Sequence, residues 1–197
     1  MIVIVGLGNT PKEYANTRHN VGFRVLDELA KQIAAKPKWQ GKDHRAELMG
    51  RLNGEPVLLI KPQEFMNSSG QGVRAAVDFY RVSMKDIWVV FDDVNVDLGF
   101  IRVRESGSSG GHKGVESIIN HLRGGEFPRV RVGVGPLPAK TEPNSEVQVA
   151  DKLLTDFVLS RFSKGDRKVI NKVVEAASRL ITEALPGKTL KEQTVRV

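Results

Sequence analysis

The side chains best suited to acid–base chemistry in this sequence are four histidines and two adjacent aspartates. They are His19, His44, His112 and His121, with Asp92 and Asp93. Asp92 directly follows an apolar run at 87–91 that predicts a buried strand. A carboxylate at such a strand end can hold an imidazole in one tautomer and support its basicity. A His19–Asp92 pair would act as a general base, and the alternative is a turn acid beside a capping or surface histidine.

The same sequence excludes or disfavours several other kinds of chemistry. It contains no cysteine, which excludes disulfides, thiolate nucleophiles and thiolate metal ligands. The histidines show neither H-x-H nor H-E-x-x-H spacing, so no metal site is predicted. No G-x-S-x-G nucleophile elbow occurs either. A histidine–aspartate pair without a protein nucleophile indicates direct hydrolysis by an activated water molecule.

Two glycine-containing loops are candidate binding elements. The first is Gly6-Leu7-Gly8-Asn9, but Pro11 stands where a dinucleotide-binding motif needs its third glycine. This loop instead places Asn9 at the carboxyl end of a first strand, where open α/β sheets bind ligands. The second, 106–114, could receive a phosphate or close over a substrate, and the alternative is a plain flexible loop. The basic residues around it are Arg102, Arg104, Lys113, Arg129 and Arg131.

Composition indicates a folded protein with an uneven excess of positive charge. The 197 residues are 40% hydrophobic and 27% charged, with a net charge of +7. Residues 161–197 carry 9 Lys/Arg against 4 Asp/Glu and so hold most of the excess. Such a segment attracts a polyanion, and the alternative is a solvated helix face. No apolar stretch reaches about 18 residues, and the first residues lack a basic signal-peptide region. We therefore expect a cytoplasmic protein without a membrane segment.

The hydrophobic patterns alternate between strand and helix periods. Strands are predicted at 2–5, 46–52, 56–60, 87–91, 100–104 and 130–134, and helices at 21–33, 68–81, 115–122 and 169–185. This alternation predicts an α/β protein. Asn53-Gly54 is a strong hairpin signal, so the sheet is expected to be mixed rather than purely parallel. Residues 136–144 are the most linker-like stretch, which we interpret as a loop within one domain.

Six motifs, in order along the chain, together resemble the bacterial-type peptidyl-tRNA hydrolase family. They are 4–9 with Tyr14 and 17–23; 61–70 (KPQEFMNSSG); 92–99 (DDVNVDLG); 109–114 (SGGHKG); 129–135 (RVRVGVG); and 156–159 (DFVL). Each motif is weak alone, but their order and their spread over most of the chain are specific. The resemblance implies a single α/β domain over 1–197, three-layered, with a mixed twisted sheet flanked by helices.

The resemblance also implies a role for each matching residue. His19 would be the general base that activates water, Asp92 would keep it basic, and Asn9 would help distinguish a peptide-blocked ester from a free aminoacyl ester. The residues assigned to substrate and tRNA binding are Tyr14, Phe65, Asn67, Arg104, His112, Lys113 and Arg131. The first three would contact the acylated 3′ end or the first peptide unit, and the arginines would lie near phosphate. The resemblance implies peptidyl-tRNA as the partner and implies neither a cofactor nor a metal ion. We expect a monomer.

Three positions depart from the pattern of that family. Thr10-Pro11-Lys12 replaces the usual Pro-Gly after Asn9, which removes a glycine from the loop. Lys113 replaces an Asn, and a lysine cannot accept a hydrogen bond but can hold a phosphate. Phe91, before Asp92, cannot form a hydrogen bond. These changes leave the His19–Asp92 pair intact.

Two other functions remain open on the sequence alone. The same fold could serve a non-catalytic RNA-binding protein, which would not turn over a peptidyl-tRNA. The chain could also hydrolyse small esters or peptides, at rates that do not depend on an RNA part of the substrate. Hydrolysis of a blocked aminoacyl-tRNA, measured beside its unblocked counterpart, separates these alternatives.

Overall fold

The computed structural model describes residues 1–136 and 147–197, and its strands form one sheet. The strands are β1 (Ile2–Gly6), β2 (Gln40–Lys42), β3 (Arg45–Leu52), β4 (Glu55–Pro62), β5 (Ile87–Asp97), β6 (Phe100–Arg104), β7 (Arg129–Gly135) and β8 (Gln193–Arg196). The helices are α1 (Val21–Ile33), α2 (Ser69–Tyr80), α3 (Lys113–Leu122), α4 (Val147–Leu159) and α5 (Lys164–Ala184). No helix in the described ranges is long and apolar enough to cross a membrane.

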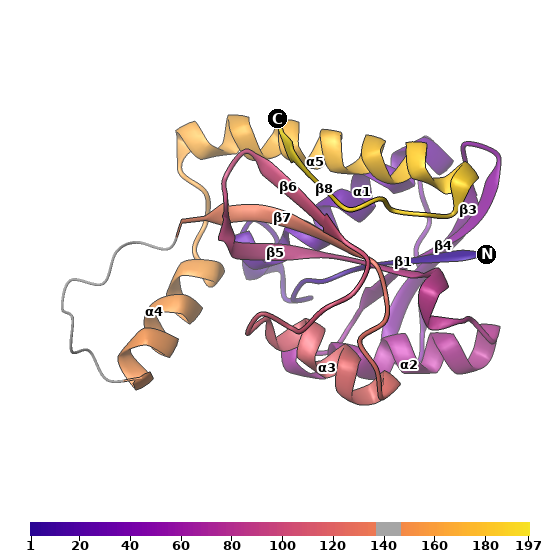
Figure 1. Cartoon of the computed structure of the whole chain (residues 1–197), viewed down its shortest axis with the longest axis horizontal. Coiled ribbons are helices and arrows are strands. Elements are labelled where there is room, and N and C mark those ends of the chain that lie inside the picture. Colours follow the sequence, from indigo (N-terminus) through magenta and orange to yellow (C-terminus); the bar gives the residue numbers. More distant parts are fainter. Residues whose placement is uncertain (137–146) are drawn as a thin grey trace.

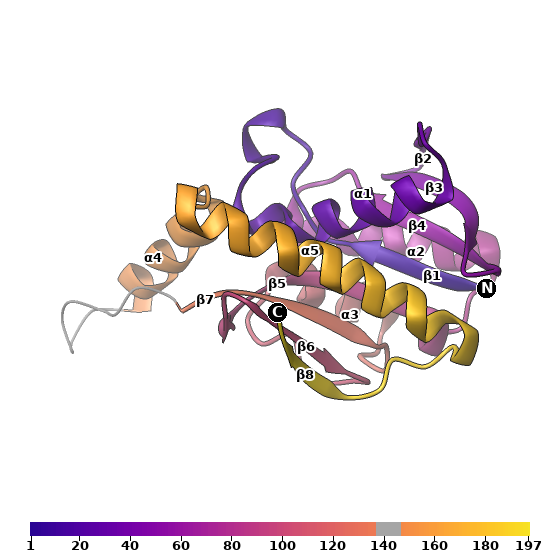
Figure 2. The same ribbon diagram turned by 90° about the horizontal axis from the view of Figure 1, so that it is seen from above.

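The sheet is mixed, and its strand order is β2-β3-β4-β1-β5-β7-β6-β8. β1 runs parallel to β4 and β5, and β5 runs parallel to β7. The pairs β2–β3, β3–β4, β6–β7 and β6–β8 are antiparallel. Helices α1 and α5 cover one face and α2 and α3 the other, which gives three layers, whereas α4 projects from one end (Figures 1 and 2). The predicted α/β class and mixed sheet are therefore confirmed.

The central strands are buried on both faces, which explains their continuous apolar runs. Alternate residues of β1 enter different cores: Ile2 and Ile4 pack in the core under α1 and α5, and Val3 and Val5 pack in the core under α2 and α3. At the antiparallel edge only one face of β6 is covered, because Ile101 and Val103 join the α1–α5 core. The intervening side chains of β6 point to the other face.

Several predicted elements are confirmed, and one correction matters for function. The helix at 21–33 has the predicted bounds, and Asn53-Gly54 closes the β3–β4 hairpin with positive φ at both residues (47° and 80°), as a two-residue turn of type I′ requires. The predicted strand 87–91 instead continues to Asp97. Asp92 and Asp93 therefore lie within β5, and the turn-acid alternative is wrong.

The sequence patterns also missed some elements. The strands β2 and β8 are short and exposed, so they carry little hydrophobic signal. Helix α4 was not predicted, and α5 begins at Lys164, five residues before the predicted start, because Ser163 caps it by accepting a hydrogen bond from the Asp166 N–H. Of the predicted loop at 136–144, all but the first residue lies outside the described residues.

Glycine allows α1 to begin directly against the sheet. A Cβ added at Gly22 would lie 2.5 Å from the Leu7 nitrogen and would also collide with the Val90 carbonyl oxygen. The Phe23 N–H donates to the Leu7 carbonyl oxygen at 3.2 Å across the same contact. This backbone approach sets the entry of α1, and hence of the turn that carries His19, against β1 and β5.

We predict that Gly22→Ala destabilises the fold, because no rotamer change can remove a clash between a Cβ and fixed backbone atoms. The expected loss of unfolding free energy is about 1–3 kcal/mol, measured by urea unfolding. Gly41→Ala is the matched control, since its added Cβ meets nothing within 4 Å. Equal stability of the two variants would show that the close approach is not needed.

Candidate active site

Two histidines share one buried carboxylate at the centre of the candidate site. His19 Nδ1 lies 2.8 Å from Asp92 Oδ1, and His112 Nε2 lies 3.1 Å from the same oxygen. Asp92 is only 2% exposed. β1 pairs with β5 as far as Gly6 opposite Val90, so Asp92 lies just beyond the end of β1 although β5 continues. The carboxylate therefore faces the crevice outside the carboxyl end of a parallel strand.

The hydrogen-bond pattern defines the tautomer of each ring. His112 caps α3: its Nδ1 accepts from the backbone N–H groups of Gly114 and Val115, at 3.2 and 3.3 Å. Its proton must therefore be on Nε2, which donates to Asp92. His19 donates to Asp92 through Nδ1, which leaves its Nε2 as an unprotonated acceptor. This arrangement prepares the His19 imidazole to take a proton.

Burial and charge act in opposite directions on these groups. Burial alone disfavours ionised Asp92, but the charges and hydrogen bonds of His19 and His112 outweigh burial and lower the pKa of its carboxyl well below the usual range. Burial also lowers the pKa of His19, and Asp92 more than compensates, so that the pKa of His19 is raised above its ordinary value of 6.5. The charge of Lys113 partly opposes this rise.

Asn9 is held at the edge of the site by a second asparagine. The Asn9 N–H donates to Asn20 Oδ1 at 2.9 Å, and Asn20 Nδ2 donates to the Asn9 carbonyl oxygen at 2.8 Å. The Asn9 side-chain oxygen accepts from the Met66 N–H at 3.1 Å. Its amide nitrogen is thus left to donate to a ligand, and the loop keeps this geometry despite Pro11.

These side chains line a cavity of about 290 Å³. Its wall comprises Asn9, Tyr14, His19, Phe65, Met66, Asn67, Phe91, Asp92, Asp93, Val94, Ser109, Gly110, Gly111, His112, Lys113 and Arg131, with Leu154, Thr155, Val158 and Leu159 from α4. Phe65 is 68% exposed at this wall, so its ring is accessible to a ligand. The cavity has a polar floor around Asp92 and an apolar side made by α4.

The arginines beside the cavity divide into paired and unpaired groups. Arg129 is buried, and its Nη2 donates to the Gly107 carbonyl oxygen at 2.6 Å and to that of Gly125 at 3.1 Å, so it anchors the glycine–serine loop. Burial lowers the pKa of Arg129 to about 10. Arg131 forms an ion pair with Asp93. Arg102 and Arg104, opposite them in the β6–β7 register, form no ion pair with any described acidic residue.

The central cluster also offers ligand atoms to a metal ion. Nitrogen atoms of His19 and His112 and an oxygen of Asp92 lie within 4.8 Å of one another, and this donor set is one that zinc can take. Both imidazoles also hydrogen-bond the carboxylate directly, and these bonds suit acid–base chemistry.

Comparison with known proteins agrees with the geometry. The family model described as "Peptidyl-tRNA hydrolase" matches residues 3–196. The peptidyl-tRNA hydrolase of Thermoanaerobacter sp. (strain X514) is 44% identical over 183 residues, covering 92% of this chain and 91% of the relative. That of Clostridium beijerinckii is 39% identical over 188 residues, covering 94% and 90%. The chain belongs to the peptidyl-tRNA hydrolase family.

A solved structure extends this assignment to the fold. The crystal structure of peptidyl-tRNA hydrolase from Acinetobacter baumannii matches with a TM-score of 0.81 and 29% identity, covering 95% of this chain and 92% of that one. A mutant form of the same protein matches equally well. The three-layer architecture is therefore that of solved peptidyl-tRNA hydrolases.

In this member of the peptidyl-tRNA hydrolase family, the fold brings most of the site residues predicted from the motifs to one cavity. Of the residues to which the resemblance gave a catalytic or binding role, all line the cavity except Arg104, which lies on β6 outside it. Sequence reasoning missed two features: Asn20, whose buried amide orients Asn9, and the bond from His112 to Asp92. His112 lies just before a predicted helix, where a cap is needed, but no local pattern reveals its second partner.

We predict that Asp92→Asn lowers the pKa of His19. The substitution removes the charge that raises this pKa, whereas burial and Lys113, which lower it, remain. An NMR pH titration of the His19 ring should therefore show protonation at lower pH than in the unsubstituted chain. An unchanged His19 titration would refute the electrostatic coupling.

Proposed function

We propose that this chain hydrolyses the ester bond of peptidyl-tRNA and releases free tRNA and peptide, with His19 as the general base. The observation that carries this proposal is the His19–Asp92 hydrogen bond at the cavity wall, which leaves His19 Nε2 as an acceptor. Membership of the family supplies the substrate class. The proposal also includes the cytoplasm as the protein's location and a monomer as its oligomeric state.

The reaction follows from the state of the two groups. A water molecule bound near His19 attacks the ester carbonyl carbon, and its proton moves to His19 Nε2. Asp92 stabilises the imidazolium that forms. Collapse of the tetrahedral intermediate breaks the bond to the ribose oxygen, which takes the proton back from His19. The cycle regenerates neutral His19 without a covalent intermediate.

The charge that develops on the carbonyl oxygen requires donors. The Asn9 amide nitrogen is free to donate, because the side-chain oxygen is engaged by the Met66 N–H. Asn67 and Lys113 also line the cavity, and Lys113 opens α3, whose N-terminal end favours negative charge. These groups can stabilise the oxyanion or hold a terminal phosphate.

The RNA part of the substrate is assigned to exposed and partly exposed side chains at the cavity and beside it. Tyr14 and Phe65 offer aromatic faces on which a base of the 3′ end can stack. Arg104 and Arg131 share one face of the sheet and are assigned to phosphate. Arg131 is the weaker candidate, because Asp93 already neutralises part of its charge. A non-catalytic RNA binder would keep this surface, so turnover remains the deciding assay.

We predict that His19→Ala lowers turnover of a blocked aminoacyl-tRNA by about 10²–10⁴-fold, the usual contribution of a general base. Single-turnover hydrolysis of labelled substrate measures it, with circular dichroism to show that the fold is retained. His44→Ala is the matched control, because His44 pairs with Glu64 and does not line the cavity. Retention of half the activity by His19→Ala would mean that another group is the base.

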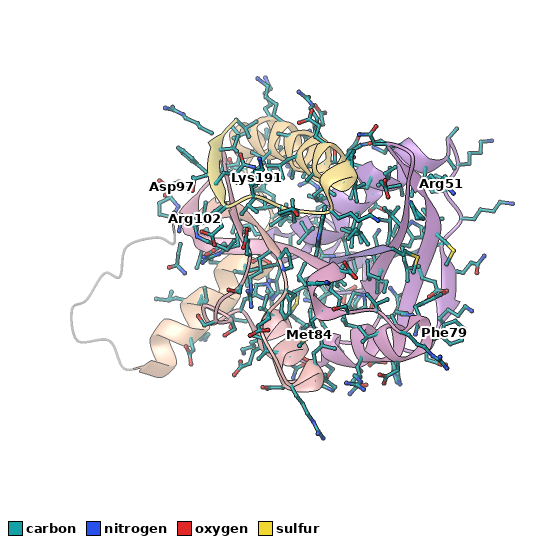
Figure 3. The ribbon with its side chains drawn as sticks, turned by 45° about the vertical axis from the view of Figure 1, so that its right-hand side comes forward. Arg51, Phe79, Met84, Asp97, Arg102 and Lys191 are labelled. Atoms are coloured by element: carbon teal, nitrogen blue, oxygen red, sulfur yellow. The ribbon has the colours of Figure 1, made fainter. Side chains whose placement is uncertain are left out.

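A second prediction concerns the binding of tRNA phosphate groups. Arg104→Ala should raise KM for full-length tRNA substrates and reduce the slope of log binding constant against log salt by about 0.7–0.9, the value for one phosphate contact. Arg51→Ala is the control: Arg51 lies on the opposite side of the molecule from Arg102, a neighbour of Arg104 in β6 (Figure 3). An equal salt slope in both variants would place the phosphate contact elsewhere.

A further inference from the structure

Arg18 directly precedes the proposed base, His19. It connects the turn that contains both residues to the segment that joins α4 and α5. The Arg18 backbone N–H donates to the Ser160 carbonyl oxygen at 3.1 Å, and Thr17 forms an antiparallel bridge with Arg161. The Arg18 guanidinium Nη1 donates to Ser160 Oγ at 2.7 Å and to the Arg161 carbonyl oxygen at 2.9 Å. The Arg18 side chain is only 12% exposed, so this is an internal contact between distant parts of the chain.

Both helices at this junction contribute further contacts to the same guanidinium. Its central carbon lies 4.4 Å from the ring centre of Phe157 and 4.9 Å from that of Phe162. Asp166, in the first turn of α5, completes an ion pair at 3.7 Å. The carbonyl groups that follow the last turn of a helix need donors, and this end of the helix favours a cation. Arg18 therefore caps the C-terminal end of α4, because it donates to a carbonyl group there and places a positive charge beside it.

α4 has few other attachments in the described part of the chain. It packs chiefly against the 3-10 turn Arg18–Asn20, and it projects from the layered body (Figure 1). Its side chains nonetheless form the apolar side of the cavity. They are Leu154, Thr155, Val158 and Leu159. The distance between this wall and His19 thus depends on the contacts of Arg18.

We propose that Arg18 is a positioning residue, which holds the α4 wall beside His19 so that the peptide part of the substrate is bound next to the base. Arg18 acts through α4 and does not line the cavity. The wall that it holds is mainly apolar, which suits the side chains of a peptide rather than the nucleotide. This inference rests on the proposed hydrolysis for its meaning, but the placement of α4 can be measured without it.

The kinetic consequence is a loss of binding rather than of proton transfer. Arg18→Ala should raise KM about tenfold for a tRNA carrying a peptide of several residues and should change kcat little. A tRNA carrying one blocked amino acid should lose less, since it reaches less of α4. The acidic limb of the pH–rate profile should stay in place, because the His19–Asp92 bond is untouched. Arg24→Ala is the matched control: Arg24 also faces the Phe162 ring, but it bonds Asn171 of α5 and not α4.

A disulfide can replace the contact that Arg18 makes. Partners in an antiparallel bridge have Cα atoms about 4.5–5.5 Å apart, which a disulfide spans. Thr17→Cys and Arg161→Cys, added to Arg18→Ala, would form one, and the chain contains no other cysteine. Oxidation should restore KM to within about twofold of the value for the unsubstituted chain. Reduction of the disulfide should raise KM again.

Hydrogen exchange gives a readout that does not need activity. Backbone amides of α4 at 151–159 should exchange at least about tenfold faster in Arg18→Ala, and should be protected again in the oxidised cysteine pair. Arg18→Lys, a milder change, serves if Arg18→Ala fails to fold. Unchanged exchange in α4, or a KM that stays raised after the disulfide forms, would overturn the proposal. Changed exchange in a chain that hydrolyses no peptidyl-tRNA would instead refute only the proposed function.

Discussion

A single buried carboxylate, held ionised by two imidazoles, is the interaction on which the site depends. An isolated charge at the depth of Asp92 would cost several kcal/mol, and His19 and His112 offset this cost by directing N–H groups at the same oxygen. The offset requires that His112 keep its proton on Nε2, which its capping bonds to α3 ensure. Helix α3, strand β5 and the turn of His19 are therefore joined through one oxygen atom.

The layered fold brings these pieces to one place because its parallel strands run toward the same edge of the sheet. Asn9 lies in the loop after β1, Phe65 and Met66 lie in the segment after β4, and Asp92 lies in β5. Gly22 lets α1 begin against the sheet, so that the turn before it meets β5. The longer reach of β5 explains why a residue inside a strand still faces the crevice: its neighbour β1 has already ended.

Positive charge in this protein has more than one use. The partly buried Arg18 holds a helix end, the buried Arg129 holds a loop, and Arg131 is paired with Asp93. The basic excess at 161–197, which the sequence analysis treated as one segment, is spread over Arg161, α5, the segment 185–192 and the edge strand β8. α5 covers the face of the sheet opposite to Arg102 and Arg104. The net charge is therefore larger than the positive charge that one face of the protein can present to an RNA molecule.

The sequence by itself determined the class of the fold, the hairpin and nine of the twenty residues that line the cavity. Hydrophobic period and turn chemistry are local properties of the chain, and the motifs can be read in order along it. It could not show that Asp92 lies inside β5, that His112 shares its oxygen with His19, or that Arg18 closes α4. The short edge strands also escaped prediction, since four or fewer exposed residues carry little pattern. Each of these features joins residues far apart in sequence, and only tertiary packing decides which distant groups meet.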